Sequence, residues 1–150
     1  MKKTAIIFGI ILLSGVFLYA VNQVNIEKEK QAVKKVIQDA LVDGYLNDYD
    51  VEKMKKGIHP EFTIMELRNN ELQKRGFSDL LDYVKKVKPE RPNGRRVRVN
   101  IKMLTVDVIG NIGSAKVEFY VGDTHHGTDF ITLMKFEDGW KLMVSAACEV

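Results

Sequence analysis

Residues 97–108, with the sequence VRVNIKMLTVDV, decide the fold class of this chain. From Val97 to Met103 apolar and polar residues alternate, which is the pattern of a β-strand with one buried face. From Leu104 to Val108 the alternation continues in the opposite phase. Since successive side chains of a strand point to opposite faces, a phase change inside one strand indicates a β-bulge or bend. The segment therefore predicts a bent strand in a curved sheet.

Three further strands follow. Gly110-Asn111 and Asp138-Gly139 are typical hairpin turns, and a loop from Gly122 to Gly127 joins the two hairpins. Alternating apolar residues predict the strands themselves, at 115–121, 129–136 and 140–148. The second half of the chain is thus expected to form four long antiparallel strands.

Before the sheet, the spacing of apolar residues changes to that of a helix. Between Asn25, a suitable N-cap, and Tyr49, they recur at the i, i+3, i+4, i+7 spacing of one helix face. These positions are Val33, Val36, Ile37, Ala40, Leu41 and Tyr45. The pattern predicts one long amphipathic helix.

Two shorter helices and a strand are expected next. Asp50 can cap a helix over 51–56 that Gly57 ends in the left-handed conformation. A β-rich stretch follows at 62–67, and Ser78 can cap a third helix over 79–87.

Helices first and antiparallel strands afterwards predict an α+β fold. We expect a curved antiparallel sheet wrapped around the long N-terminal helix, two shorter helices, and a cone-shaped pocket between helix and sheet.

The N-terminus has the pattern of an export signal. Two lysines precede an uncharged run at residues 5–21, and the best cleavage point follows Ala20. A run of this length also reaches the short limit of a membrane-spanning helix. We expect residues 1–20 to be a signal peptide, or residues 5–21 to be an N-terminal anchor. Residues 21–150 are then a single periplasmic or secreted domain.

The composition is that of an ordinary globular domain, with 45% hydrophobic and 29% charged residues. The chain has 23 Lys and Arg against 20 Asp and Glu, and without Lys2 and Lys3 of the leader the count is 21 against 20. Such a balance argues against nucleic-acid binding. Cys148 is the only cysteine, which excludes an intrachain disulfide and a cysteine-based zinc cluster.

Several stretches resemble the NTF2-like (cystatin-like α+β) superfamily, in particular its branch of putative lumazine-binding or SnoaL-like proteins. These stretches are 44-GYLNDYD-50, 58-IHPEF-62, 110-GNIGSA-115, 128-TDFITL-133 and 138-DGWKL-142. The resemblance extends over about residues 27–147. It implies a cone-shaped pocket and often a dimer through the outer sheet face. It implies no single chemistry, because the scaffold serves isomerases, cyclases, dehydratases and modules without known ligands.

Three residues are candidates for acid–base catalysis: His59, Asp129 and Tyr45. A histidine near a carboxylate can transfer protons around neutral pH, and a tyrosine hydroxyl can donate to an oxyanion. The resemblance points the same way, since dehydratase and cyclase relatives use a His-Asp pair and isomerase relatives use a tyrosine from this region. Structural roles stay open: His59 can bond the Gly57 turn, Asp129 can cap a strand, and Tyr45 can be a core residue.

Other side chains are candidates for ligand contact. Tyr45, Met65, Phe119 and Trp140 supply the apolar and aromatic surface that a small-molecule pocket needs. The same residues would serve equally well as core.

No pattern of a metal or cofactor site is present in the sequence. His125 and His126 are adjacent, so on an extended segment their side chains point to opposite sides and chelate one ion poorly. We expect neither a metal nor a cofactor.

Residues 85–98 hold the strongest charge asymmetry, seven positive charges against Glu90 alone. Both an anionic partner and a solvated loop around Pro89 and Pro92 fit this segment.

We therefore expect an exported, non-catalytic module that binds a small apolar or aromatic ligand, or a protein partner, in its cone. The alternatives are an enzyme of isomerase, cyclase or dehydratase type using His59, Asp129 and Tyr45, and a structural dimerisation domain whose cavity is filled. Apolar residues on both faces of the last two strands also predict a homodimer through the outer sheet face. Membrane contact is expected only through an uncleaved N-terminal segment.

Overall fold

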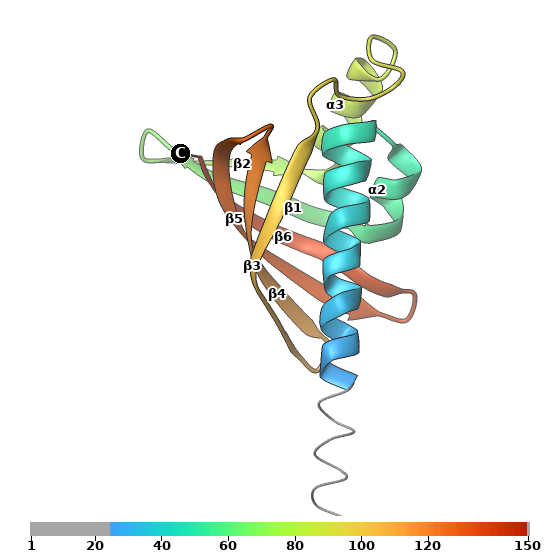
Figure 1. The fold of residues 1–150 in the computed structure, drawn as a ribbon, viewed down its shortest axis with the longest axis vertical. Coiled ribbons are helices and arrows are strands. Elements are labelled where there is room, and N and C mark those ends of the chain that lie inside the picture. Colours follow the sequence, from blue (N-terminus) through green and yellow to red (C-terminus); the bar gives the residue numbers. More distant parts are fainter. Residues whose placement is uncertain (1–24, 150) are drawn as a thin grey trace, which may run out of the picture.

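The computed structural model describes residues 25–149 and has one long helix lying across a strongly curved sheet, with two short helices beside the end of that helix (Figure 1). The predicted signal peptide and anchor lie outside the described residues. None of the helices within 25–149 has the length and apolar character needed to cross a membrane.

The long helix is α-helical over residues 25–36 and continues as a π-helical segment, η1 (Ile37–Asp48). The remaining elements are α2 (Val51–Gly57), β1 (Ile58–Arg68), β2 (Glu71–Gly76), α3 (Phe77–Val87), β3 (Val99–Ile109), β4 (Ile112–Val121), β5 (Thr124–Phe136) and β6 (Gly139–Glu149). Both short helices and all four predicted C-terminal strands are present, which confirms the predicted α+β architecture.

The six strands form one open sheet in the order β2-β1-β6-β5-β4-β3. Neighbours are antiparallel except β1 and β6, which are parallel. The register of β3 against β4 shifts between Met103 and Thr105, which confirms the predicted bulge at the phase change. A second shift between Phe119 and Tyr120 and a third between Thr132 and Leu133 add to the curvature.

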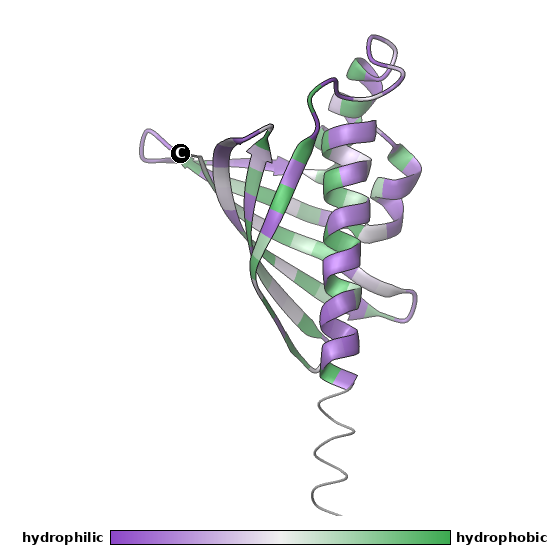
Figure 2. Ribbon diagram, viewed as in Figure 1, coloured by the Kyte–Doolittle hydropathy of each residue, from purple (hydrophilic) through white to green (hydrophobic). Residues whose placement is uncertain are grey.

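The core lies between the long helix and the concave face of the sheet. The predicted helix positions Val33, Ile37, Ala40, Leu41 and Tyr45 are all buried. They pack against strand residues that include Val117, Ile131, Leu133 and Leu142. Figure 2 shows the same arrangement, with hydrophobic residues on the helix stripe and along the central strands. Each such side chain contributes about 1.5–3 kcal/mol when removed from water.

The narrow end of the cone is closed by a hydrogen-bonded contact between helix and sheet. Glu29 of the helix accepts from the Trp140 indole Nε1 at 2.7 Å and from Lys135 Nζ at 2.6 Å. These two hydrogen bonds lower the pKa of the Glu29 carboxyl. Trp140 is buried, so its hydrogen bond satisfies a donor that would otherwise be left without water.

The wide end is held by Asn47, near the end of η1. Its side-chain amide donates to the Val99 carbonyl at 2.9 Å and accepts the Val99 N–H at 2.8 Å. Gly94 packs against the Asn47 backbone carbonyl so closely that a Cβ at its φ of +84° would lie 2.3 Å from that oxygen. The first residue of β3 is therefore fixed to the last turn of the long helix.

Three local predictions are wrong. Asp50 does cap α2, but Gly57 does not end it in the left-handed conformation, because β1 begins at the next residue. Gly57 is needed for close packing instead: a Cβ there would lie 2.6 Å from the Ala40 Cβ. Helix α3 begins at Phe77, where Asp79 accepts the Gly76 N–H, so Ser78 is not its cap.

The third wrong prediction is the loop from Gly122 to Gly127. The turn is limited to Gly122 and Asp123, and β5 begins at Thr124. Strand β2 was not predicted at all. It pairs with β1 through a turn at Asn69 and Asn70, both at positive φ.

The Asn47 contact yields a stability prediction. Asn47→Ala leaves the buried N–H and carbonyl of Val99 without partners, which costs about 1–3 kcal/mol for each unsatisfied group. We expect chemical denaturation to show a loss of at least about 2 kcal/mol in unfolding free energy. Asn100→Ala, the same change at an exposed position one residue further along β3, is the control and should be nearly neutral. Equal stability of the two variants would contradict the role given to Asn47.

Candidate functional site

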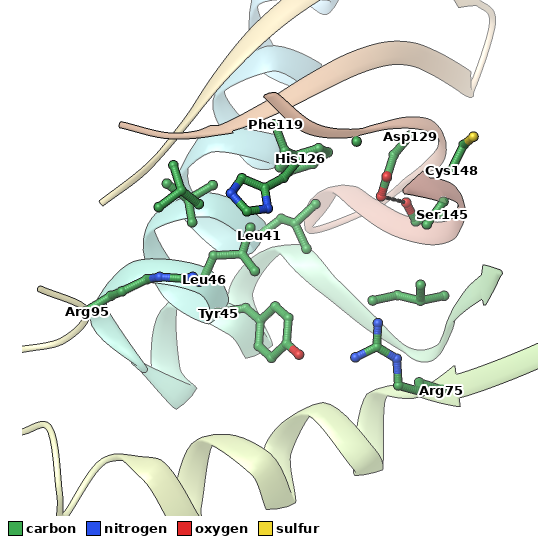
Figure 3. Close-up of a pocket in the computed structure, with 15 residues that line it drawn as sticks. Leu41, Tyr45, Leu46, Arg75, Arg95, Phe119, His126, Asp129, Ser145 and Cys148 are labelled. Carbon is green, nitrogen blue, oxygen red and sulfur yellow. Dashed lines mark hydrogen bonds between the residues drawn. The ribbon is translucent and has the colours of Figure 1, made fainter. Parts of the chain in front are cut away.

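The wide end of the cone holds a cavity of about 280 Å³. Its walls come from η1, from the loop before β3, and from all six strands (Figure 3). Seven of the fifteen lining residues are apolar. The apolar lining consists of Leu41, Leu46, Ile64, Val99, Phe119, Val121 and Ala147.

A partly buried polar pair on two neighbouring strands forms one side of this cavity. Ser145 Oγ on β6 donates to Asp129 Oδ2 on β5 at 2.6 Å, and Ser145 is 0% exposed. Burial raises the pKa of the Asp129 carboxyl above its usual value of 3.8. The hydrogen bond from Ser145 acts against this shift, and the nearby carboxylate of Glu66 adds to it. Asp129 is therefore a carboxyl group whose proton is held more tightly than usual.

Tyr45 brings a hydroxyl to the cavity from the long helix. Burial raises the pKa of this phenol, while the guanidinium of Arg75 acts to lower it. Its ring meets the edge of Tyr83 on α3, with ring centroids 6.0 Å apart. In Figure 3 the hydroxyl points across the cavity mouth toward Arg75.

Three cationic or titratable side chains stand at the rim: Arg75 from β2, Arg95 from the loop before β3, and His126 from β5. His126 is directed there by the β4–β5 register shift, because His125 pairs with Tyr120 and Gly127 pairs with Phe119, which leaves His126 as the extra residue.

Two of the three predicted catalytic residues, Tyr45 and Asp129, line this one cavity, and His59 does not. The His59 ring stacks on Phe136 with centroids 4.9 Å apart, and its Nδ1 accepts the Glu61 N–H at 3.1 Å. Phe136 ends β5 seven residues beyond Asp129, which is roughly 20 Å along a strand. The structure therefore separates His59 from Asp129, and a histidine acting with Asp129 would have to be His126.

Of the four predicted ligand contacts, Tyr45 and Phe119 line the cavity. Met65 does not, because it alternates with the inward-facing Ile64 and Glu66 and lies on the outer face of the sheet. Trp140 packs at the narrow end, where Glu29 binds its indole. The cavity thus takes its aromatic surface from two of the four residues.

The side chains of the adjacent His125 and His126 have different surroundings, as predicted for neighbouring residues of an extended strand. His125 Nε2 lies 2.9 Å from the Gly127 carbonyl and its ring packs against Tyr120, whereas His126 faces the cavity. Within residues 25–149 no three His, Cys, Asp or Glu side chains cluster in a way that could hold a metal ion.

Sequence reasoning missed Arg75, Arg95 and Ser145 as cavity residues. Arg75 lies on the strand that was not predicted, and Arg95 was included only as one charge of the basic stretch. The available signal for Ser145 was its place in the alternation of β6, two residues before Ala147 on the same face.

Part of the basic stretch has a structural role. Arg98 binds Asp48 and Asp43, at 2.8 and 3.3 Å, and Lys88 Nζ donates to the Asp48 carbonyl at 2.7 Å. These contacts fasten the loop before β3 to the end of the long helix.

Comparison with known proteins agrees with this geometry. Residues 28–146 match the model of a family described as "Putative lumazine-binding". An NTF2-like protein of unknown function from Shewanella baltica OS155 has a similar solved structure, with 18% identity, a TM-score of 0.63, and coverage of 82% of this chain and 94% of that one. A second such protein, from Silicibacter pomeroyi DSS-3, has 13% identity, a TM-score of 0.67, and coverage of 83% and 98%.

At these identities the likeness to solved structures concerns the fold alone. Together with the family match, it confirms the predicted NTF2-like assignment. A search of curated proteins finds no match for the chain.

The buried Asp129 gives a pH prediction. A carboxyl whose native pKa is raised binds more protons in the folded than in the unfolded state, so stability falls as pH rises from its usual value of 3.8 through the raised native value. The amide of an Asp129→Asn variant cannot ionise yet still accepts from Ser145. We expect the variant to be more stable than the parent at pH 7 and no more stable below pH 3.8.

Thermal unfolding across this pH range measures the difference. Asp123→Asn, at an exposed turn residue, is the control and should follow the parent at every pH. A variant at position 129 that is less stable at pH 7 would show that the carboxylate stabilises the fold.

Proposed function

Because this chain belongs to the family described as putative lumazine-binding, we propose that its cone binds a small apolar or aromatic molecule and that the protein is a non-catalytic binding module. The observation that carries this proposal is the cavity of about 280 Å³ at the wide end, which combines seven apolar residues with the partly buried Asp129-Ser145 pair and polar side chains at its rim. Ligand pockets typically begin at about 300 Å³ and combine apolar walls with few polar groups. A ligand of one or two fused rings suits this volume.

Binding is favoured over catalysis by the placement of the acid–base residues. The enzyme alternative requires His59, Asp129 and Tyr45 to reach one substrate atom within hydrogen-bond distance or through one water. His59 is engaged with Phe136 and Glu61 instead. The polar groups that do line the cavity, among them Tyr45 and the Asp129-Ser145 pair, can orient a ligand.

A homodimer through the outer sheet face accompanies this proposal. Phe130 and Met134 of β5 and Ile112 of β4 are 59%, 41% and 49% exposed. Ile112 pairs directly with Met134, and Phe130 lies on the same face of β5 with Thr132 between it and Met134, so exposed apolar side chains gather opposite the cone. Such surface on a soluble domain usually marks association.

The binding test uses lumazine and the neutral bicycle 2-naphthamide with the full-length protein, measured by isothermal titration calorimetry. Ala147→Phe places a ring inside the cavity, and we expect it to reduce the affinity for either probe by at least about tenfold. Ala146→Phe makes the same change one residue earlier, on the outer face, and should leave the affinity unchanged. Failure of lumazine, of 2-naphthamide and of its anionic analogue 2-naphthoate to bind at millimolar concentration would contradict the proposal.

The dimer test replaces an exposed ring with a charge. Phe130→Asp should weaken self-association by at least about tenfold, because the charge loses its water in the interface. Leu72→Asp, at a leucine 56% exposed on the edge strand β2, is the matched control and should keep the dimer. Sedimentation velocity measures the mass of the parent protein and of each variant in solution. A parent protein that sediments as a monomer at micromolar concentration would refute the dimer.

A further inference from the structure

Two arginines from separate parts of the chain line the mouth of the cone. Arg75 is the fifth residue of β2, and Arg95 lies in the loop between α3 and β3. Both line the cavity, and both also line the adjoining hollow between η1 and α3. In Figure 3 they approach from opposite sides, with Tyr45 between them. The entrance therefore carries two fixed positive charges.

The guanidinium groups of Arg75 and Arg95 differ from those of neighbouring arginines, which form contacts that hold the fold. Arg98 is bound by two aspartates and Arg91 lies against the Tyr49 hydroxyl. By contrast, no carboxylate among residues 25–149 lies within ion-pairing distance of Arg75 or Arg95. The Arg75 guanidinium acts on two neutral or acidic groups of the cavity, the Tyr45 hydroxyl and the Asp129 carboxyl. Both arginines are thus available to an incoming anion.

One carboxyl group, that of Asp129, lines the cavity itself. It is bound by Ser145, and the nearby Glu66, which pairs with Arg68 outside the cavity lining, acts on it. Asp79 borders the adjoining hollow but already accepts the Gly76 N–H at 2.7 Å. An anion is repelled by the Asp129 carboxylate and attracted by the arginines at the rim. Charge alone therefore orients an anionic ligand with its charged group outward.

The surface between these two zones is apolar. Leu41 from the long helix and Phe119 from β4 line the cavity between its rim and the Asp129-Ser145 pair (Figure 3). A flat ring contacts such surfaces favourably and requires no polar partner there.

From this arrangement we propose that the ligand is an aromatic carboxylate, with its ring against Leu41 and Phe119 and its carboxylate directed toward the arginines of the rim, Arg75 and Arg95. The planar guanidinium matches the planar carboxylate and can bind it through two parallel hydrogen bonds. This proposal rests on the proposed binding function and specifies the chemical class of the ligand.

The test compares 2-naphthoate with 2-naphthamide, which has the same rings and no charge. Calorimetry with the full-length protein at low salt should show tighter binding of the naphthoate by about tenfold or more. Arg75→Gln and Arg95→Gln should each weaken naphthoate binding by about fivefold and change naphthamide binding by less than about twofold. Added salt should weaken only the naphthoate.

Two controls address charge and folding. Lys74→Gln removes the same charge from the neighbouring residue of β2, whose side chain points to the other face of the sheet, and should not affect either probe. Arg75→Lys keeps the charge without the planar fork and should retain part of the preference for naphthoate. Circular dichroism establishes that each variant is folded.

The outcomes separate the two proposals. If both probes bind with equal affinity and Arg75→Gln changes neither affinity, the proposal of an aromatic carboxylate ligand is overturned. The proposal that the cone binds a small molecule then still stands. Naphthamide binding without naphthoate binding would overturn it as well. If lumazine and both naphthalene probes fail to bind, the proposed binding function falls too.

Discussion

The shape of this molecule depends on one constraint, the pair of hydrogen bonds between the Asn47 side chain and the backbone of Val99. Asn47 offers Val99 both the donor and the acceptor that a neighbouring strand would offer, although it belongs to a helix. Asn47 is 1% exposed, so neither bond competes with water. The contact spans 52 residues of sequence and fixes the outermost strand, β3, to the end of the long helix. That connection determines how wide the cone opens.

The two ends of the cone are held by different chemistry, and only one is closed. At the narrow end Trp140 fills the space beneath the helix and is bound by Glu29. At the wide end the facing strand positions carry small or short side chains, namely Gly127, Ser145 and Ala147. These side chains cannot reach Leu41 and Tyr45 across the gap. The cavity is therefore a consequence of residue size at these strand positions.

Ser145 and Asp129 make the cavity polar on one side. Ser145 and Asp129 lie on adjacent strands and hydrogen-bond to each other. The Asp129 carboxyl is partly buried, and this burial raises its pKa, so its ionised form is less favourable than in water. A group with this cost is better explained by ligand binding than by packing, because an apolar residue would serve packing better.

The sequence predicted those features that depend on local pattern. The phase change at Leu104 located the bulge, and the apolar stripe of the long helix located the core. Both signals arise because a strand or helix with one buried face needs apolar residues at its own structural period. It could not predict β2, whose residues are nearly all exposed and show no alternation. His59 and Asp129 suit acid–base chemistry by residue type, but the strand order puts β6 between β1 and β5, and the His59 ring stacks on Phe136. Arg75 and Arg95 come to line one cavity only through the tertiary fold, so no spacing in the sequence signals their shared position.

A crystal structure of the full-length protein with 2-naphthoate is the most direct test of whether the wide end of the cone is a preformed ligand site. We expect electron density for the ring between Leu41 and Phe119, with the carboxylate toward Arg75 and Arg95 and the Asn47 hydrogen bonds to Val99 unchanged. A cone filled by rearranged side chains, with the naphthoate bound only to the outer face of the sheet, would contradict a preformed site.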